Sequence, residues 1–577
     1  MRETTIRIIC TIIVAVIFVS SVVAVRSLNT DFGKVDTQQV SIASQLGKIS
    51  GLLYRPAYAT ATNPQPAVVL AHGISGSKQY LSGIALELAR NSIVALTIDL
   101  LGHGGSDGKL SDGNEDASLG MLASVRYLEA QDFVNSSAIG LVGHSLGAGS
   151  ARATAVAHGR IRSTVLIAGG FGSMVAGPVY GTFNSTFPEN LLVAIGKYDV
   201  LFNLDELKKE TLPPIFGTPT EVIENALYGE FSGHNARKLV TPPTTHLFEP
   251  VDPVIGSETI TWLINALQPT GLDENPRPTA GLAIYRDISI LTGLVTLLGL
   301  LLLISSTVFS FVHYPKVKRN IQMRTKAQSI RDWKVLIVLG TLSLILFFPM
   351  TLVGSIINIP PVIFGSSIAW WTLASATAAF IVVALWSRFS NSELKVKAAL
   401  TQAFDVQGLI AAALIFIALY LLAAFVSTYM VINFGIIVPF FRALIPTTRI
   451  PVFFMFIPFF FVYFMVEGLY LHELRQPSWR KSALLTAIVD LAKTIGIKIT
   501  PFLAVLLLQY IPFVLLGFQL FPSFAGFLLE FLWLLIPIFM ISTACSWWLY
   551  HSTTRIGPGA VLNALVFAWI AASLFPF

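Results

Sequence analysis

Ser145 is the residue in this sequence best suited to covalent chemistry. It lies between Gly143 and Gly147 in the stretch "GLVGHSLGAGSA". The letters "AIGLVGHS" are typical of a buried strand, and "LGAGSARATAVAHG" favours a helix directly after it. A G-x-S-x-G motif at such a strand-to-helix turn holds the serine hydroxyl exposed above a sheet. The sequence therefore predicts Ser145 as the nucleophile of an acyl-transfer reaction.

A serine hydroxyl is a weak nucleophile until a base takes its proton. At this kind of turn an acid and then a histidine follow the serine along the chain. Asp199 ends the strand-like run "LLVAIGKYD" and is the predicted acid, with Asp205 as the alternative. His246 follows the last strand-like run, whereas His234 precedes it. Because loops at the carboxyl ends of parallel strands reach the site, His246 is the predicted base and His234 a surface-loop residue.

The negatively charged oxygen formed during acyl transfer needs two N–H donors. The amide of Leu146, directly after the serine, is the first candidate, and that of Ile74 in the loop "HGISGSK" is the second. This chemistry uses neither a metal nor a cofactor, and none is expected. Three histidines near these motifs are predicted to be structural or to line a pocket: His72, His103 and His144. Asp99, in "TIDLLGHGGSDG", is predicted to tie down its glycine-rich turn.

Strand-like and helix-like stretches alternate from Gln39 to about Leu267. An opening hairpin is expected first, and a last strand near "ARKLVTPP" and a helix at "GSETITWLINAL" close the pattern. The buried strands between them are "AVVLAHG", "IVALTIDL", "AIGLVGHS", "STVLIAGG" and "LLVAIGKYD". This alternation predicts a mostly parallel sheet flanked by helices over residues 39–268. A polar stretch rich in Pro and Gly predicts a linker over 269–287.

Three motifs together, "LAHGISGSKQY", "IDLLGHGGSDG" and "GHSLGAGSA", give this region a family resemblance. It resembles the α/β-hydrolase superfamily, and within it the serine aminopeptidase and monoacylglycerol-lipase-like branch. The resemblance implies a triad of Ser145, Asp199 and His246, with the Leu146 and Ile74 amides as oxyanion hole. The stretch before "LLVAIGKYD" is shorter than the lid of many lipases of this branch. The stretch between Asp199 and His246 is longer, and a small cap is expected there.

The composition indicates a membrane protein. Hydrophobic residues make up 54% of the 577 residues and charged residues only 12%, whereas soluble proteins carry about 25% charged residues. From Arg26 to Asp287 the sequence has 18 Lys+Arg against 24 Asp+Glu, a net charge of −6. Because the whole chain has a net charge of +6, the remainder carries a net charge of +12. Basic residues beside apolar spans mark cytoplasmic loops, so nucleic acid is not an expected partner. Both cysteines, Cys10 and Cys545, lie in apolar stretches, which excludes a disulfide within residues 39–268.

An apolar run from Ile8 to Val25 follows Arg2 and Arg7. It predicts a signal-anchor helix over residues 1–26, with a signal peptide cleaved near Ala24 as the alternative. Residues 288–577 predict about eight further spans. They are expected near Ile288–Val312, Val335–Ile357, Ile363–Trp386, Leu409–Met430, Val452–Leu471, Pro501–Phe521, Phe524–Trp548 and Gly559–Phe577. The basic residues predict a multi-pass protein of the cell membrane with a cytoplasmic N-terminus and an extracytoplasmic hydrolase domain.

Several charged residues lie in or near these spans, where a charge marks either a functional site or a buried pair: Glu467, Asp490, Lys493 and Glu530. The segment "SALLTAIVDLAKTIGIKI" is expected as an amphipathic helix lying at the membrane interface. Two functions fit the sequence. One is a membrane-anchored serine hydrolase that cleaves an ester, or less readily an amide, of a lipid or membrane-attached substrate. The other is a transporter or scaffold with a hydrolase-like regulatory domain. Five apolar residues could contact an acyl chain or simply pack: Phe171, Met174, Val175, Val179 and Phe183.

Overall fold

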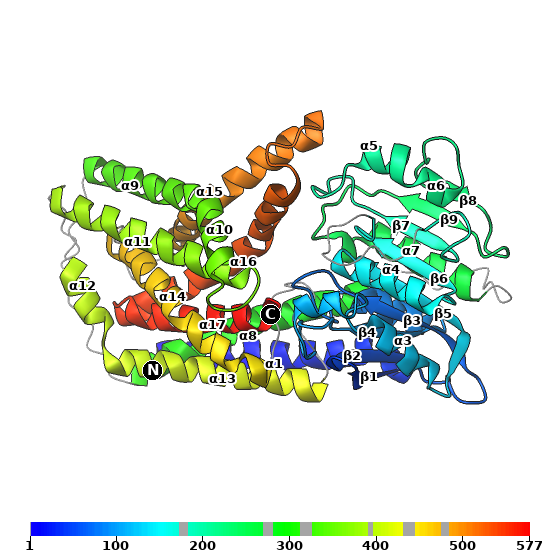
Figure 1. Ribbon diagram of the computed structural model, residues 1–577. Coiled ribbons are helices and arrows are strands. Elements are labelled where there is room, and N and C mark those ends of the chain that lie inside the picture. The colour runs from blue at the N-terminus through cyan, green and yellow to red at the C-terminus, as the bar shows by residue number, and fades with distance from the viewer. Residues whose placement is uncertain are drawn as a thin grey trace.

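The computed structural model combines an α/β domain with a set of long helices beside it (Figure 1). It describes residues 2–171, 183–268, 281–311, 326–389, 396–430, 445–474 and 484–577. The first helix, α1 (Arg2–Asn29), leads from the helical domain into the α/β domain, and α8 (Gly281–Phe311) returns beside it. The α/β domain is therefore held between two neighbouring helices.

The sheet has nine strands in the order β1-β2-β4-β3-β5-β6-β7-β9-β8. Strands β3, β4, β5, β6, β7 and β9 run parallel, whereas β1 and β2 form an antiparallel hairpin at one edge and β8 adds an antiparallel strand at the other. The strands are β1 (Val35–Ser44), β2 (Gly47–Pro56), β3 (Gln65–Ala71), β4 (Val94–Ile98), β5 (Val134–His144), β6 (Ser163–Ile167), β7 (Leu191–Ala194), β8 (Leu227–Tyr228) and β9 (Arg237–Val240). The predicted fold class, a mostly parallel sheet with an opening hairpin, is confirmed.

Helices cover both faces of the sheet because successive side chains of each buried strand point to opposite faces. In β3, Val68 and Leu70 pack with helices α2 (Ser82–Arg90) and α7 (Pro253–Leu267). Val69 packs on the other face with α3 (Met121–Glu129) and α4 (Leu146–His158). Short turns of helix complete the domain: η1 (Asp31–Gly33), η2 (Leu110–Asn114), α5 (Leu204–Glu206), η3 (Leu207–Thr211), α6 (Pro213–Phe216) and η4 (Glu249–Val251).

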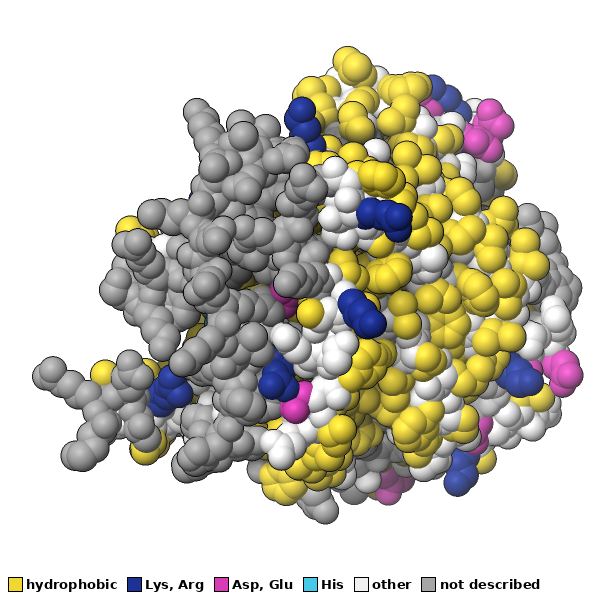
Figure 2. All heavy atoms as spheres, turned by 90° about the vertical axis from the view of Figure 1, so that its left-hand side faces the viewer, with side chains coloured by type: hydrophobic (Ala, Val, Ile, Leu, Met, Phe, Trp, Pro, Cys, Tyr) yellow, Lys and Arg dark blue, Asp and Glu magenta, His cyan; other side chains and the backbone are white. Residues whose placement is uncertain are grey.

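In the described part of the chain, eight helices are long and apolar enough to cross a membrane, or nine if α9 and α10, bent by 44°, form one span. After α8 the helices are α9 (Lys326–Ile345), α10 (Phe347–Ile357), α11 (Gly365–Phe389), α12 (Val396–Ala403), α13 (Val406–Met430), α14 (Ile450–Gly468), α15 (Leu484–Leu516), α16 (Ser523–Thr553) and α17 (Gly557–Leu574). Two shorter turns, η6 (Thr447–Arg449) and η7 (Leu469–Leu474), flank α14. Figure 2 looks onto the end of this domain away from the sheet, where Lys and Arg side chains lie among hydrophobic ones.

Two segments differ from the sequence-based expectation. The expected interfacial helix is continuous with the following candidate span, and the two together form α15. Its residue Asp490 is buried, and Asp490 Oδ2 accepts a hydrogen bond from Trp547 Nε1 of α16 at 2.7 Å. The expected linker is also partly helical. Helix α8 begins at Gly281, where the Glu87 carboxylate accepts the N–H groups of Leu282 and Ala283 and so caps its first turn.

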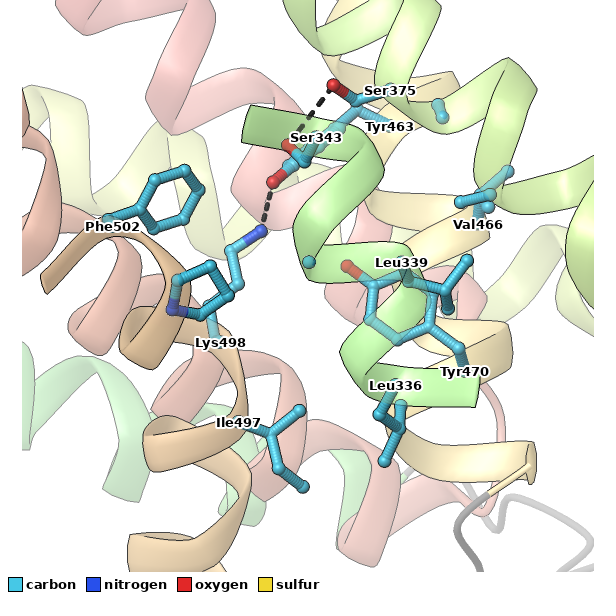
Figure 3. A pocket seen from close by; sticks show the side chains of 14 residues that line it. Leu336, Leu339, Ser343, Ser375, Tyr463, Val466, Tyr470, Ile497, Lys498 and Phe502 are labelled. Carbon is cyan, nitrogen blue, oxygen red and sulfur yellow. Dashed lines mark hydrogen bonds between the residues drawn. The ribbon is translucent and has the colours of Figure 1, made fainter. Parts of the chain in front are cut away.

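The helical domain contains a cavity of about 40 Å³ (Figure 3), and an ion pair is buried beside it. Lys498 Nζ lies 2.5 Å from Glu467 Oε1. The same ammonium group lies 4.4 Å from the ring centres of Tyr463 and Phe539 and donates a hydrogen bond to the Tyr463 hydroxyl. Removing one partner of such a buried pair would leave an uncompensated charge. The expectation of a paired buried site at Glu467 is therefore met in this structure.

Candidate active site

The turn at Ser145 is tight and strained. It joins the end of β5 to the start of α4, and Ser145 has φ 53° and ψ −112°. A Cβ at Gly147 would lie 2.3 Å from the Ala71 carbonyl oxygen, and one at Gly143 would lie 2.0 Å from the Gly147 carbonyl oxygen. Only glycine fits these two positions, since real Cβ atoms do not approach so closely. The backbone N–H of Ser145 donates to Ile167 O of the next strand and fixes the turn on the sheet.

The structure brings together the three residues that the sequence singled out. His246 Nε2 lies 2.9 Å from Ser145 Oγ, and its Nδ1 lies 2.8 Å from Asp199 Oδ2. Asp199 follows β7 and also accepts the N–H of Leu201 at 2.8 Å through its Oδ1. His246 follows β9, the neighbouring parallel strand. A carboxylate at Nδ1 favours the tautomer whose Nε2 can accept the serine proton. The arrangement can thus activate a nucleophile.

The candidate oxyanion hole lies on two elements beside the serine. Leu146 is the first residue of α4, so its N–H is among those that lack a partner inside the helix. Ile74 belongs to the loop after β3. The residue before it, Gly73, approaches so closely that a Cβ there would lie 3.2 Å from Ser145 Cβ. The structure places this loop next to the serine, and the donor role of Leu146 and Ile74 stays a prediction.

The two alternatives lie away from this cluster. The Asp205 side chain is 76% exposed, in α5, and its Oδ2 lies 3.7 Å from Lys209 Nζ. His234 lies before β9, and its carbonyl accepts the N–H of Asn190, which precedes β7. His234 therefore lies toward the amino ends of these strands, whereas Asp199 and His246 lie at their carboxyl ends.

The polar residues around the motifs bind backbone groups. His72 Nε2 accepts the N–H of Leu100 at 3.2 Å, and the His103 ring contacts the Leu101 carbonyl at 3.0 Å. Asp99 accepts the N–H groups of Lys78 and Gly105 at 2.7 and 2.9 Å. Lys78 Nζ also lies 2.6 Å from Asp99 Oδ2. Asp99 therefore ties down its glycine-rich turn, as the sequence predicted, and it also binds the loop after β3.

His144 supports the loop that carries the candidate base. Its Nε2 lies 3.0 Å from the His246 carbonyl oxygen and 3.4 Å from Glu249 Oε2. Burial lowers the pKa of His144 well below its ordinary value, so the ring is neutral and can donate to that carbonyl. This places His144 in a structural role beneath the site.

Glu249 is a residue of the site that the sequence analysis missed. It is fully buried, accepts the N–H of Gly196, and its Oε2 lies 4.0 Å from His246 Nδ1. Burial and the nearby Asp199 carboxylate raise the pKa of Glu249 well above its ordinary value. Its position three residues after His246 was the available signal, because a turn of helix brings such residues together.

The cluster of His144, His246 and Glu249 has ligand atoms within 4.8 Å of one another and could geometrically hold a metal ion. Both ring nitrogens of His246 are already engaged, by Ser145 and Asp199. A metal at this place would have to displace one of those two contacts. The donor set therefore fits hydrogen bonding better than a metal centre.

The candidate acyl-chain residues are only partly described. Phe183 is buried in the core, where its ring lies 5.8 Å from that of Phe187, and Phe171 is half-buried. Met174, Val175 and Val179 lie outside the described residues. Between Asp199 and His246, where a cap was expected, the chain forms α5, η3, α6 and the edge strand β8.

Comparison with known proteins identifies the α/β domain. Residues 68–288 match the family model of the alpha/beta hydrolase family. The α/β domain is therefore an α/β-hydrolase domain, which the three motifs predicted, in a chain that continues into long apolar helices. No curated protein matches the sequence.

Three solved structures similar to this chain illustrate the comparison. A cold-adapted esterase from an Arctic intertidal metagenomic library, bound to PEG, is 18% identical with a TM-score of 0.30, covering 41% of this chain and 95% of that chain. The Pyrococcus furiosus esterase Pf2001 is 18% identical with a TM-score of 0.30, covering 41% and 96% respectively. DcsB, in complex with its substrate analogue, is 14% identical with a TM-score of 0.29, covering 40% and 99%.

Proposed function

We propose that this protein is a membrane-anchored serine hydrolase that cleaves an ester, and less readily an amide. The observation that carries the proposal is the continuous hydrogen-bonded series from Asp199 through His246 to Ser145. Ser145 Oγ attacks the carbonyl carbon while His246 Nε2 takes its proton, and the Leu146 and Ile74 amides bind the oxyanion. The imidazolium then gives the proton to the leaving alcohol. In the second half of the reaction, water attacks the acyl-enzyme while His246 takes its proton, and His246 returns that proton to Ser145 Oγ as the acid leaves.

A fluorophosphonate probe tests this proposal directly, because it reacts with serines activated by a base. We expect the full-length protein in native membranes to be labelled, and mass spectrometry of the labelled peptide to place the probe on Ser145. A protein denatured before addition of the probe serves as the control and should stay unlabelled. Failure to label the native protein would argue for a regulatory hydrolase-like domain instead.

The hydrolysis rate should depend on pH through His246. Burial lowers the pKa of His246, but its hydrogen bond to Asp199 and the charges of Asp199 and Glu530 leave this pKa raised above its ordinary value. The base must be unprotonated to accept the serine proton, so activity is lost as pH falls through this raised pKa. We expect the acid limb of kcat/KM to have its midpoint above about 6.5. Rates with a short soluble ester from about pH 5 to about pH 9 measure it, and a midpoint well below 6 would contradict the assignment.

We propose that the hydrolase domain, over residues 39–268, faces the exterior and that the basic segment Pro315–Lys334 lies in the cytoplasm. Single cysteines at Lys109, an exposed residue of the domain, and at Lys326 test this orientation in a Cys10→Ser background. An impermeant thiol reagent added to intact cells should modify Lys109→Cys only. Permeabilised cells are the control, in which both variants react. Modification of Lys326→Cys in intact cells would reverse the proposed topology.

We further propose that the substrate is a lipid ester or another membrane-attached ester. The support is that residues beside Asp199 lie against the helical domain: the N–H of Ser523 donates to Val200 O at 3.1 Å, and the rings of Tyr198 and Phe513 lie 5.8 Å apart. Each buried methylene contributes about 0.8 kcal/mol, so kcat/KM should rise at least about tenfold from a butanoate to a dodecanoate ester. Equal values for the two esters would leave the bilayer without a role in substrate choice.

A further inference from the structure

The loop that carries His246 is bound from two sides through its next residue, Leu247. Leu247 is buried, and its carbonyl accepts a hydrogen bond from the Tyr80 hydroxyl of the α/β domain. Its N–H donates to Glu530 Oε2 of α16 at 3.1 Å. One backbone group of this residue is thus bound by the α/β domain and the other by the helical domain.

Glu530 is itself held in place by a second helix. It is fully buried, and its Oε1 accepts a hydrogen bond from the Tyr510 hydroxyl of α15 at 2.8 Å. Because one oxygen binds α15 and the other binds the histidine loop, the carboxylate joins the packed helices to the hydrolase site. A buried carboxylate is costly to maintain unless its oxygens are hydrogen-bonded in this way.

The start of α16 also contacts the site through neighbouring residues. The Phe527 ring lies 5.5 Å from the His246 imidazole and meets it at 86°, in an edge-to-face contact. As the hydrogen bond from Ser523 to Val200 also shows, the turn between α15 and α16 lies against the α/β domain (Figure 1). The helical domain therefore contacts the loops of both the candidate acid and the candidate base.

The charged and titratable groups around His246 come from three directions. Asp199 and Glu249 face its Nδ1 at 2.8 and 4.0 Å, and the His144 ring lies 5.0 Å away. Glu530 adds a carboxylate from α16. Burial lowers the pKa of His246, whereas the charges of Asp199 and Glu530 raise it. A negative charge here favours the imidazolium that forms when the serine loses its proton.

We propose that Glu530 is a positioning residue of the hydrolase site: it fixes the His246 loop through the Leu247 N–H and places a carboxyl group on the α16 side of the imidazole. This inference rests on the proposed serine-hydrolase function. It means that the active site is completed by the helical domain, so that a residue of a candidate membrane span determines how the base of the α/β domain is held.

Three variants of the full-length protein test the inference with a short soluble ester. Glu530→Ala removes both the hydrogen bond and the charge, and kcat should fall about 10- to 100-fold with little change in KM, since misplacing a catalytic group affects the reaction step. Glu530→Gln keeps an acceptor for the Leu247 N–H but loses the charge. It should restore kcat to within about threefold of the parent while moving the acid limb of the pH profile to lower pH. Tyr510→Phe, which removes one hydrogen bond to the carboxylate, should give a smaller loss than Glu530→Ala.

Ser542→Ala is the matched control, because it removes another buried polar group of α16, whose hydroxyl donates to Phe539 O within the same helix. It should leave kcat and the pH profile as in the parent. Parental kinetics and an unmoved acid limb in both Glu530 variants would overturn the inference, as would equal losses in the control. If Glu530→Ala does not fold, the Glu530→Gln pH profile and the Tyr510→Phe rate decide alone. A parent that the fluorophosphonate does not label refutes the proposed function, whereas a labelled parent insensitive to Glu530 refutes only this inference.

Discussion

Ser145→Ala should reduce ester turnover by roughly 10³- to 10⁶-fold. The substitution removes the hydroxyl that is proposed to form the acyl-enzyme, so His246 and Asp199 have no hydroxyl at this turn to activate. Alanine is smaller than serine and leaves the hydrogen bond from the backbone N–H to Ile167 O in place, so the domain should fold as before. Turnover is measured with a short soluble ester on equal amounts of protein purified from membranes, and thermal unfolding verifies that each variant is folded.

Ser137→Ala is the matched control for this prediction. Ser137 is an exposed serine on β5, the strand that leads to Ser145, and its hydroxyl bonds Asn135 at 2.8 Å. The control should retain parental turnover and labelling. If Ser145→Ala retained turnover as well, the nucleophile would have to be sought elsewhere in the chain.

His246→Ala should be nearly as damaging as the serine substitution, whereas His234→Ala should cost less than about threefold, because triad residues act as a unit. Without His246 the serine hydroxyl keeps its proton. Asp199, whose Oδ2 lies 2.8 Å from His246 Nδ1 in the parent, then has no imidazole to orient. His234 contributes mainly backbone contacts at the opposite end of the strands. The two variants are compared by kcat/KM and by the rate of fluorophosphonate labelling.

The reverse result, a severe His234→Ala and a mild His246→Ala, would contradict the assignment of the base. Equal severity would instead indicate damage to folding, which thermal unfolding of each variant distinguishes. His246→Ala should therefore be folded and inactive.

The α/β domain could be predicted from sequence because its signals are local. The strand-like runs, the glycines around Ser145 and the order serine, acid, histidine each depend on a few neighbouring letters. The choice between His246 and His234 needed only the position of the last strand, and the structure places His246 beside Asp199. Local patterns of this kind determine which residues lie at the carboxyl ends of the strands.

The parts of the site that could not be predicted from the sequence depend on contacts between segments far apart in the chain. Glu530 stood out in the sequence as a charge within an apolar span, but nothing in its neighbourhood identified Leu247, 283 residues earlier, as its partner. The continuity of the expected interfacial helix with the rest of α15 was missed for a similar reason. Its polar residue Asp490 is bonded to Trp547 in α16 rather than exposed to water, and amphipathic periodicity alone cannot distinguish these cases. Capping of α8 by Glu87 likewise required the tertiary fold.

The contact between Leu247 and Glu530 also has a consequence for the order in which the protein is synthesised. A ribosome reaches Glu530 283 residues after Leu247, which at about 5–20 residues per second is a delay of roughly 15–60 s. During this interval the α/β domain can fold on its own chain while the histidine loop lacks its partner on α16. Nascent chains would then be weak hydrolases until their last helices are inserted. The membrane lipids would thereby be protected from hydrolysis by truncated or unfinished copies of the protein.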